Sequence, residues 1–184
     1  HFADRANFVP YPYQFRCPVH KVKNCSCEGE GPLSQFNSLF DTEYGGVINP
    51  KTNHCEYGGF FVEPLQATGG YIVPPFNYFK GLKKTLEKYN ILFVDDEVQM
   101  GFFRTGKMWA IEHFGVNPDI IVFAKACTNG LNPLSGIWAR EGLISPEVFP
   151  PGSTHCTYSS NPLGTSAALA VMKLIEEENF GVSV

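Results

Sequence analysis

The sequence predicts an α/β protein with a central, mainly parallel sheet and flanking helices, and two observations support this fold class. Short apolar runs without polar alternation are interleaved with amphipathic segments from residue 58 onward, and such strands are typical of sheets covered on both faces. The chain has 184 residues, of which 43% are hydrophobic and 17% charged, and this length and composition are sufficient for one globular core.

A change in composition and hydrophobic pattern divides the chain into an irregular segment, residues 1–57, and an α/β core, residues 58–184. The first segment is rich in proline and aromatic residues, and its prolines prevent a regular helix over most of its length. One short amphipathic helix is expected within residues 31–45, where apolar residues recur at helical spacing.

The elements of the core follow in order from residue 58. We expect a buried strand in GGFFVEP, a helix with lysines on its outer face in NYFKGLKKTLEKYN, and a second buried strand in ILFVDDEVQ. After these come a short helix in GKMWAIEHFGV, a third strand in DIIVFAK, a fourth in LSGIWA and a long helix in NPLGTSAALAVMKLIEEENF.

Charge and hydropathy exclude several classes of function. The formal net charge is −4 without a block of like charge, so neither nucleic acid nor an anionic membrane surface is an expected partner. No apolar run has the length of a membrane span, and no signal peptide is recognisable. We expect a cytoplasmic protein, with the mitochondrial matrix as the alternative. Phosphate-loop, dinucleotide-binding and nucleophile-elbow motifs are absent from the sequence.

The six cysteines are expected to be free thiols, because their density is low for a disulfide framework. One group of histidines and cysteines could be offered as a zinc site, but its spacing differs from the paired C-x-x-C pattern of structural zinc modules. We therefore expect no metal. The group consists of His20, Cys25, Cys27, His54 and Cys55.

Polar residues follow three of the predicted strands, namely Glu63, Asp96 and Lys125, and ligands of open α/β sheets bind outside the carboxyl ends of the strands. On spacing alone, Lys125 is most simply a strand-end lysine that extends its amine to solvent. The alternative is a desolvated, neutral amine that forms a Schiff base with a carbonyl compound.

Strand alternation places Asp96 on one side of the sheet and Asp95 and Glu97 on the other. A divalent cation held by all three carboxylates, which would make this a metal-binding domain, is therefore disfavoured. A single carboxylate that points into a pocket suits a flat cationic ring better.

The segment VDDEVQMGFFRTGKMWAIEHFGVNPDIIVFAKACTNGLNPLSG closely resembles the signature of class III aminotransferases, which are pyridoxal-phosphate enzymes of fold type I. The segments FFVEPLQATGGYIVPPFNYFKGLK and STHCTYSSNPLGTSAALAVMKLIEEE agree with it, so the resemblance covers residues 58–180. It implies that the chain is the later part of the family's large domain. The family's cofactor-phosphate loop and its C-terminal small domain would lie outside the sequence.

The resemblance also implies roles for individual residues. Lys125 would hold pyridoxal 5'-phosphate as a Schiff base and move the substrate proton, and Asp96 would keep the pyridine nitrogen protonated. Val98 would pack on the cofactor ring, and Gln99 would lie near its phenolic oxygen. Glu63 matches a family glutamate behind the cofactor.

Thr157 matches the threonine that contacts the cofactor phosphate of a neighbouring subunit, which implies a homodimer or higher homo-oligomer. Arg104 is expected to be structural and to pair with Glu97. Phe103 replaces a glycine of the family motif, so the local turn is expected to differ.

The activity that the resemblance implies is transfer of an amino group from an amino acid or amine to an α-keto acid or aldehyde. A racemase, decarboxylase or aminomutase of the same fold would use the same lysine and aspartate. A non-catalytic fragment without the phosphate loop is the alternative from a different class.

Overall fold

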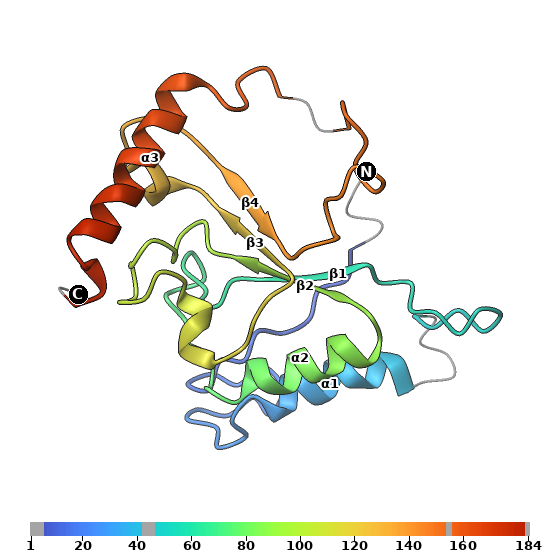
Figure 1. Ribbon diagram of the computed structural model, residues 1–184. Helices are drawn as coiled ribbons and strands as arrows, with labels where there is room; N and C mark the ends of the chain where they lie inside the picture. Colours follow the sequence, from blue (N-terminus) through green and yellow to red (C-terminus); the bar gives the residue numbers. More distant parts are fainter. Residues whose placement is uncertain (1–5, 42–46, 154–155, 183–184) are drawn as a thin grey trace.

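The computed structural model describes residues 6–41, 47–153 and 156–182, and within them the predicted central, mainly parallel sheet is present (Figure 1). Its four strands lie in the order β1-β2-β3-β4, with the first three parallel and β4 antiparallel to β3. The strands are β1 (Gly59–Val62), β2 (Leu92–Asp96), β3 (Ile120–Phe123) and β4 (Gly136–Ala139).

Among the described residues, three α-helices and three short 3₁₀ helices accompany the sheet. In Figure 1, α1 and α2 lie together on one side of the molecule, whereas α3 lies beside the β3–β4 end, where it packs against η3. The helices are α1 (Glu30–Asp41), α2 (Tyr78–Lys88), α3 (Pro162–Glu177), η2 (Ala110–Phe114), η3 (Lys125–Thr128) and η4 (Phe180–Val182).

The helix boundaries have local causes. At the start of α3, the Asn161 side chain accepts a hydrogen bond of 2.7 Å from the backbone N–H of Gly164, and proline occupies the first helical position, both of which favour helix initiation. Gly115 ends η2 with a φ of 64°, a left-handed conformation that glycine adopts without steric cost. The short helix predicted in GKMWAIEHFGV is therefore confirmed, as a 3₁₀ helix.

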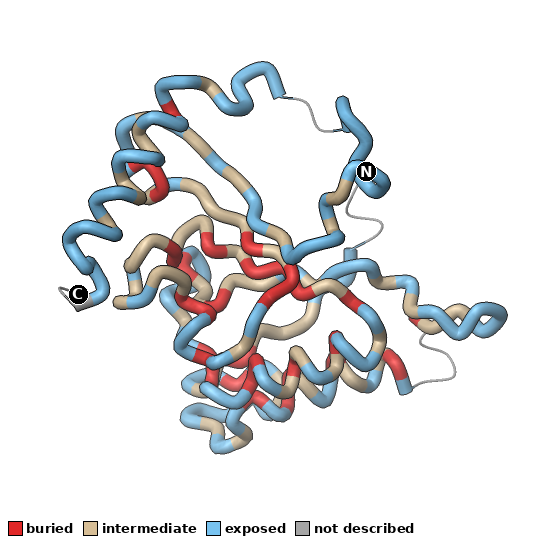
Figure 2. The backbone as a smooth tube through the Cα atoms, in the orientation of Figure 1, coloured by how far each residue is buried: buried red, intermediate tan, exposed pale blue. Residues whose placement is uncertain are grey.

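The main hydrophobic core lies between the sheet and the α1–α2 pair, where buried residues gather in Figure 2. Phe79 of α2 is fully buried and its ring lies 6.0 Å from that of Phe93 on β2 and 4.8 Å from that of Phe114. Helix α1 contributes Phe36 and Phe40 to the same core, which confirms the amphipathic helix expected within residues 31–45. The apolar face predicted for α2 is buried throughout.

Strand β1 is less buried than its apolar sequence predicts. It is an edge strand, and Phe61 is 74% exposed because the described residues cover one face of the strand only. Helix α3 is also largely exposed: Leu163, Leu169 and Leu174 have half or more of their surface accessible. The prediction of a fully buried strand in GGFFVEP was therefore wrong for the side chain of Phe61.

Asp119 connects three elements at the start of β3. Its carboxylate accepts hydrogen bonds from the Phe93 backbone N–H at 2.8 Å, from Arg140 Nε at 2.7 Å and from Lys83 Nζ at 3.3 Å. Burial alone would raise the pKa of Asp119, but these three donors outweigh burial and hold the pKa below its ordinary value. The ionised carboxylate thus ties β2, β4 and α2 together.

We expect Asp119→Ala to lower the free energy of unfolding by about 2–4 kcal/mol at pH 7, because it leaves the buried Phe93 N–H without its acceptor. Since the folded-state pKa is depressed, this stabilisation is present above the ordinary pKa of 3.8 and is lost as the pH falls through the folded value. Urea denaturation at pH 7 and pH 3 measures both effects. Glu87→Ala is the matched control, because the Glu87 carboxylate is exposed and, among the described residues, forms an ion pair with Lys83 alone, at 3.8 Å. Equal losses in the two variants would contradict this role.

Candidate active site

The strand register brings three predicted site residues to one edge of the sheet. Val62 at the end of β1 pairs with Asp95, and Asp96 at the end of β2 pairs with Val122 on β3. Glu63, Asp96 and Lys125 therefore follow the carboxyl ends of three adjacent parallel strands. This is the edge at which open α/β sheets bind their ligands.

Lys125 begins η3, directly after β3, with a backbone φ of 45°. This left-handed conformation costs free energy for a residue with a Cβ and is found preferentially at functional sites. Its Nζ donates a hydrogen bond to Oε1 of Gln99, which lies beyond the end of β2. The Lys125 side chain is exposed. The described residues therefore do not shield its amine from water in the way that the interpretation of Lys125 as a neutral nucleophile expected.

Asp96 is half-buried, and its Oδ1 accepts a hydrogen bond of 3.0 Å from the backbone N–H of Val98. This bond fixes the carboxylate at the point where the strand turns away, while Oδ2 has no hydrogen-bond partner among the residues described. The same turn carries Gln99 to the Lys125 amine. One turn at the end of β2 thus carries Asp96, Val98 and Gln99, and its Gln99 contacts the lysine.

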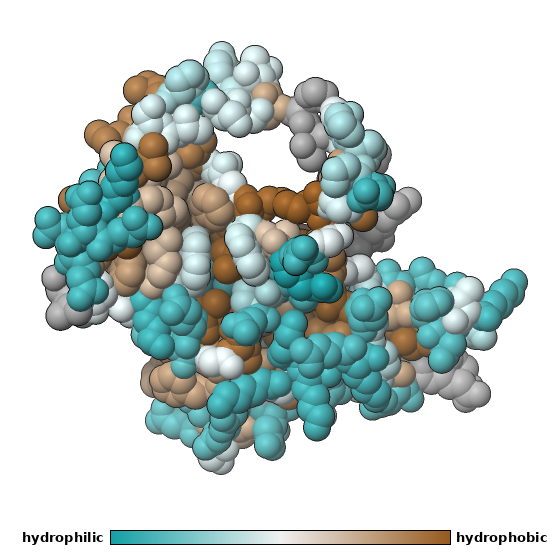
Figure 3. Space-filling model, in the orientation of Figure 1, coloured by the Kyte–Doolittle hydropathy of each residue, from teal (hydrophilic) through white to brown (hydrophobic). Residues whose placement is uncertain are grey.

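A groove with a volume of about 1010 Å³ opens beside Lys125, between the segment that follows β3 and the start of α3. Tyr158, Ser159 and Ser160 line its far side, together with Thr165 of α3. Thr157 is exposed in the same loop. Figure 3 shows an opening between the sheet and the segment that leads from β4 to α3.

Glu63 lies at the same edge but makes local contacts. Its Oε2 accepts a hydrogen bond of 3.0 Å from the backbone N–H of Ala67, and its backbone carbonyl accepts one of 3.1 Å from the Tyr11 hydroxyl. Burial raises the pKa of Tyr11 well above its ordinary value, so Tyr11 stays protonated and acts as a donor. Glu63 therefore anchors the loop after β1 to the irregular segment.

Asp95 and Glu97 point to the opposite side from Asp96, as strand alternation predicted, and both are fully buried. Glu97 Oε1 accepts a hydrogen bond of 2.9 Å from the Ile111 N–H, whereas both oxygens of Asp95 and Oε2 of Glu97 have no partner among the residues described. The predicted Glu97–Arg104 pair was wrong: Arg104 is exposed, and η2 supplies the donor to Glu97 instead.

Burial, followed by repulsion from Glu97, raises the pKa of Asp95 from 3.8 to about 9. The folded state therefore keeps a proton on Asp95 at pH values where the unfolded chain has lost it. The stability that this protonated Asp95 contributes is lost as the pH rises through the folded pKa. We expect Asp95→Asn, which removes the need for this proton, to stabilise the protein by about 1–3 kcal/mol at pH 8 and by less at pH 5. Urea denaturation at both pH values measures the gain, with the exposed Asp41→Asn as control. A loss of stability at pH 8 would contradict this account of the pair.

Phe103, which replaces a glycine of the family motif, has a backbone conformation that glycine favours. Phe103 has a φ of 62°, and its neighbour Phe102 has a φ of 57°. The Phe102 ring packs on Trp109 and Phe123 at centroid distances of 5.3 and 5.9 Å, and these contacts help to hold the strained turn. His113 Nε2 donates a hydrogen bond to the Thr105 carbonyl at 2.9 Å.

Comparison with known proteins identifies the family. The model of the family described as aminotransferase class III matches residues 7–183. The chain belongs to the class III aminotransferase family.

Two curated relatives and one solved structure illustrate the range of proteins that resemble the chain. Leucine/methionine racemase from Thermococcus litoralis is 40% identical over 94% of the chain and 36% of its own length. Ornithine aminotransferase from Oceanobacillus iheyensis is 45% identical over 80% of the chain and 40% of its own length. The structure of a transaminase from the marine bacterium Virgibacillus matches with a TM-score of 0.68 and 35% identity, over 82% of the chain and 33% of its own. The chain thus spans about a third of these relatives, and its fold is that of the pyridoxal-phosphate enzymes of fold type I.

Class III aminotransferases use pyridoxal 5'-phosphate, and the site fits one end of that cofactor. The Lys125 amine and the groove beside it offer the donor and the space that an aldehyde on a pyridinium ring requires. Asp96, which ends the neighbouring strand and does not itself line the groove, offers a free Oδ2 as the counter-ion. The described residues of this groove do not account for binding of the phosphate. They contribute hydroxyl groups, but Lys125 is the only cationic side chain among them.

Sequence reasoning singled out Lys125 and Asp96 as candidates but gave no sign of two features that lie near them. The groove-lining Tyr158 and Thr165 carry no motif signal of their own, and only the packing of α3 beside η3 brings them near the lysine. Strand alternation predicted that Asp95 and Glu97 lie on the opposite side of the sheet from Asp96. It did not predict that both are buried, because their burial depends on η2, whose Ile111 N–H bonds Glu97.

Proposed function

We propose that the protein containing this chain is a pyridoxal-phosphate-dependent aminotransferase. The observation that carries the proposal is the Lys125 amine at a parallel sheet edge, where it donates a hydrogen bond to Gln99, three residues after the strand-end carboxylate of Asp96. Membership of the class III family supports it. The substrates would be an amino acid or amine as donor and an α-keto acid or aldehyde as acceptor.

When bound, the cofactor would supply an electron-withdrawing ring that stabilises negative charge at the substrate α-carbon. Lys125 Nζ would hold the cofactor at its aldehyde carbon and, once displaced by substrate, would accept the proton from the α-carbon. Gln99 would orient that amine through its Oε1. Asp96 would keep the proton on the ring nitrogen, Val98 would pack against the ring face, and Glu63 would support the loop behind it.

We further propose a homodimer or higher homo-oligomer in which Thr157 contacts the cofactor phosphate of the neighbouring subunit. Its exposure on the loop beside the groove is compatible with a partner. The exposed apolar side chains of α3 and β4, including Leu169, Ile137 and Trp138, also favour a further protein surface against this part of the chain. Multi-angle light scattering of the purified protein tests the oligomeric state.

No helix among the described residues has both the length and the apolar character required to cross a membrane. All six cysteines are thiols in the structure, which is typical of reducing compartments. On this basis we propose a cytoplasmic location, with the mitochondrial matrix as the alternative.

A racemase is the second candidate, because the Thermococcus relative of that name aligns over nearly the whole chain. Product analysis separates the two activities. Incubation with an amino acid and 2-oxoglutarate should yield glutamate and the keto acid of the donor if the protein is an aminotransferase. Formation of the D-amino acid without keto acid would instead establish a racemase, and release of carbon dioxide a decarboxylase.

A further inference from the structure

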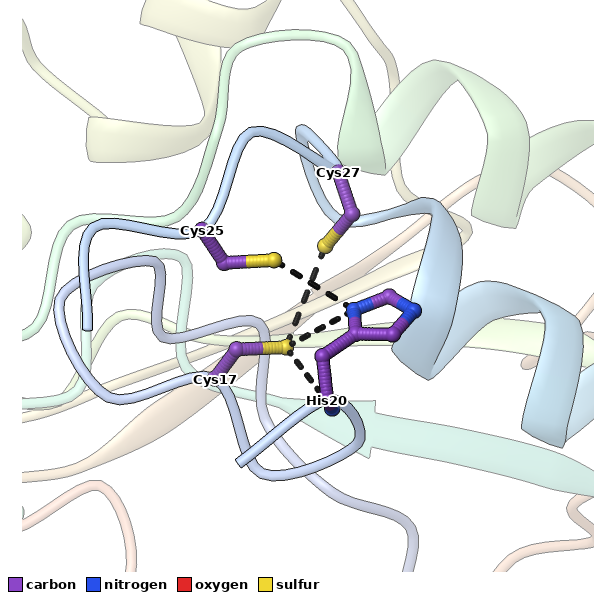
Figure 4. Close-up of side chains that lie close together, drawn as sticks. All are labelled: Cys17, His20, Cys25 and Cys27. Carbon is purple, nitrogen blue, oxygen red and sulfur yellow. Dashed lines mark hydrogen bonds between the residues drawn. The ribbon is translucent and has the colours of Figure 1, made fainter. Parts of the chain in front are cut away.

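Four potential metal ligands converge in the irregular segment that precedes α1, far along the chain from Lys125. Figure 4 shows the side chains of Cys17, Cys25 and Cys27 pointing toward one another, with the His20 ring beside them. One ligand atom from each residue lies within 4.8 Å of all the others. Of the group singled out in the sequence, His20, Cys25 and Cys27 belong to this cluster and Cys17 joins them, whereas His54 and Cys55 lie outside it.

The distances match the edges of a small tetrahedron. Cys17 Sγ lies 3.9 Å from Cys27 Sγ and 3.4 Å from His20 Nδ1, and Cys25 Sγ lies 3.3 Å from the same nitrogen. Tetrahedral zinc with Zn–S bonds of about 2.3 Å and a Zn–N bond of about 2.0 Å places sulfurs about 3.8 Å apart and sulfur and nitrogen about 3.5 Å apart. These three separations agree with the ideal values to within a few tenths of an ångström, and the other ligand pairs lie within 4.8 Å of one another.

From this geometry we propose that Cys17, His20, Cys25 and Cys27 form a structural zinc site. Three thiolates and one imidazole constitute a Cys₃His ligand set, which is soft and selects zinc over calcium or magnesium. Four protein ligands complete the tetrahedral shell and leave no position for substrate, so the ion would have no part in catalysis.

The backbone around the cluster is arranged to present these ligands. Arg16 and Lys23 form an antiparallel bridge, which closes a tight turn between the first ligand and the third. The His20 N–H donates a hydrogen bond to Cys17 Sγ at 3.5 Å, and this contact helps to hold the sulfur beside the other ligands.

The position of the His20 ring depends on glycine. A Cβ placed on Gly31, in the first turn of α1, would lie 3.0 Å from His20 Cε1. Glycine at this position therefore lets the imidazole lie against the helix start with Nδ1 facing the sulfurs.

A metal would supply stability that this segment otherwise lacks. Between residues 6 and 29 only Pro12, Cys17 and Gly29 are buried, and the structure assigns no helix or strand there. Zinc binding can replace a hydrophobic core in such segments, because its binding free energy becomes folding free energy. The bound zinc ion would fix the loop that leads into α1. The first residue of that helix, Glu30, donates its N–H to the Cys27 carbonyl at 2.8 Å.

Elemental analysis of the protein, expressed with added zinc and dialysed, tests the site. We expect about one tightly bound zinc ion per chain. Replacement by cobalt(II) should give the visible d–d bands of a tetrahedral site and thiolate-to-cobalt charge transfer, and X-ray absorption should show three sulfur neighbours and one nitrogen. Neither spectroscopic measurement depends on a variant. Absence of stoichiometric metal, or a Cys17–Cys27 disulfide in its place, would overturn the proposal.

Variants then assign the ligands. Cys17→Ser and Cys27→Ser should each lower the zinc content at least tenfold after dialysis, whereas Cys55→Ser should retain it, because Cys55 lies outside the cluster. Circular dichroism shows whether each variant remains folded. Unchanged zinc content in the double variant Cys17→Ser/Cys27→Ser would overturn the assignment. Metal content is independent of transamination, so failure of one proposal leaves the other open to its own test.

Discussion

Lys125→Ala should lower turnover by about a thousandfold or more, because no other described amine lines the groove to hold the cofactor and move the substrate proton. Lys125→Arg should be equally inactive although it retains the positive charge, since a guanidinium group is neither nucleophilic nor basic at neutral pH. Spectrophotometric assay of transamination with saturating pyridoxal phosphate measures both variants.

Lys84→Ala is the control for this experiment, because Lys84 is exposed on α2 and lies outside the groove. It should retain the activity of the unmodified protein. Addition of a small primary amine such as methylamine should restore part of the activity of Lys125→Ala, but not of a variant that has lost its fold. Undiminished turnover in Lys125→Ala would remove the lysine from the mechanism.

Asp96→Asn should lower kcat by about a hundredfold or more, because an amide cannot stabilise a positive charge on the pyridine nitrogen. The substitution is conservative in structure: the asparagine Oδ1 can still accept the hydrogen bond from the Val98 N–H, so the strand-end turn is retained. A lower kcat with a nearly unchanged melting temperature would distinguish the electrostatic role from a structural one.

The matched control is Asp41→Asn, which removes the same charge from the exposed end of α1. Asp96→Glu should recover part of the lost activity, because it restores a carboxylate at an altered distance. The proposed role would be contradicted by an Asp96→Asn variant with the kcat of the unmodified protein.

Much of the fold could be predicted because its elements have strong local signals. Helix α2 repeats apolar residues at helical spacing, and all four of them, Tyr78, Phe79, Leu82 and Leu86, are buried in the structure. Exposure of an edge strand has no such signal, because it depends on which elements lie beside it. The apolar sequence of β1 therefore gave no indication that Phe61 would be exposed.

The site was predictable to the extent that it follows strand geometry. Alternation along β2 was sufficient to separate Asp96 from the buried Asp95 and Glu97, and the parallel register then places Asp96 beside the segment that leads to Lys125. Strand geometry could not predict whether the Lys125 amine is shielded from water, because such shielding requires side chains from outside the strand ends.

The cysteine cluster shows where spacing alone was insufficient. The ligands follow a C-x₂-H-x₄-C-x-C spacing, which differs from the paired pattern of familiar zinc modules. Their convergence depends on the turn closed by Arg16 and Lys23, and a pairing of this kind between short irregular segments carries no hydrophobic periodicity from which it could be predicted.

Covalent trapping of the cofactor tests the central assignment most directly. The purified protein, incubated with pyridoxal phosphate, reduced with borohydride and digested, should yield a peptide that carries the pyridoxyl group on Lys125, and the protein should show the visible absorbance of lysine-bound cofactor before reduction. A protein that stays colourless, or whose label lies on another lysine while the Lys125 peptide is unmodified, would contradict the account.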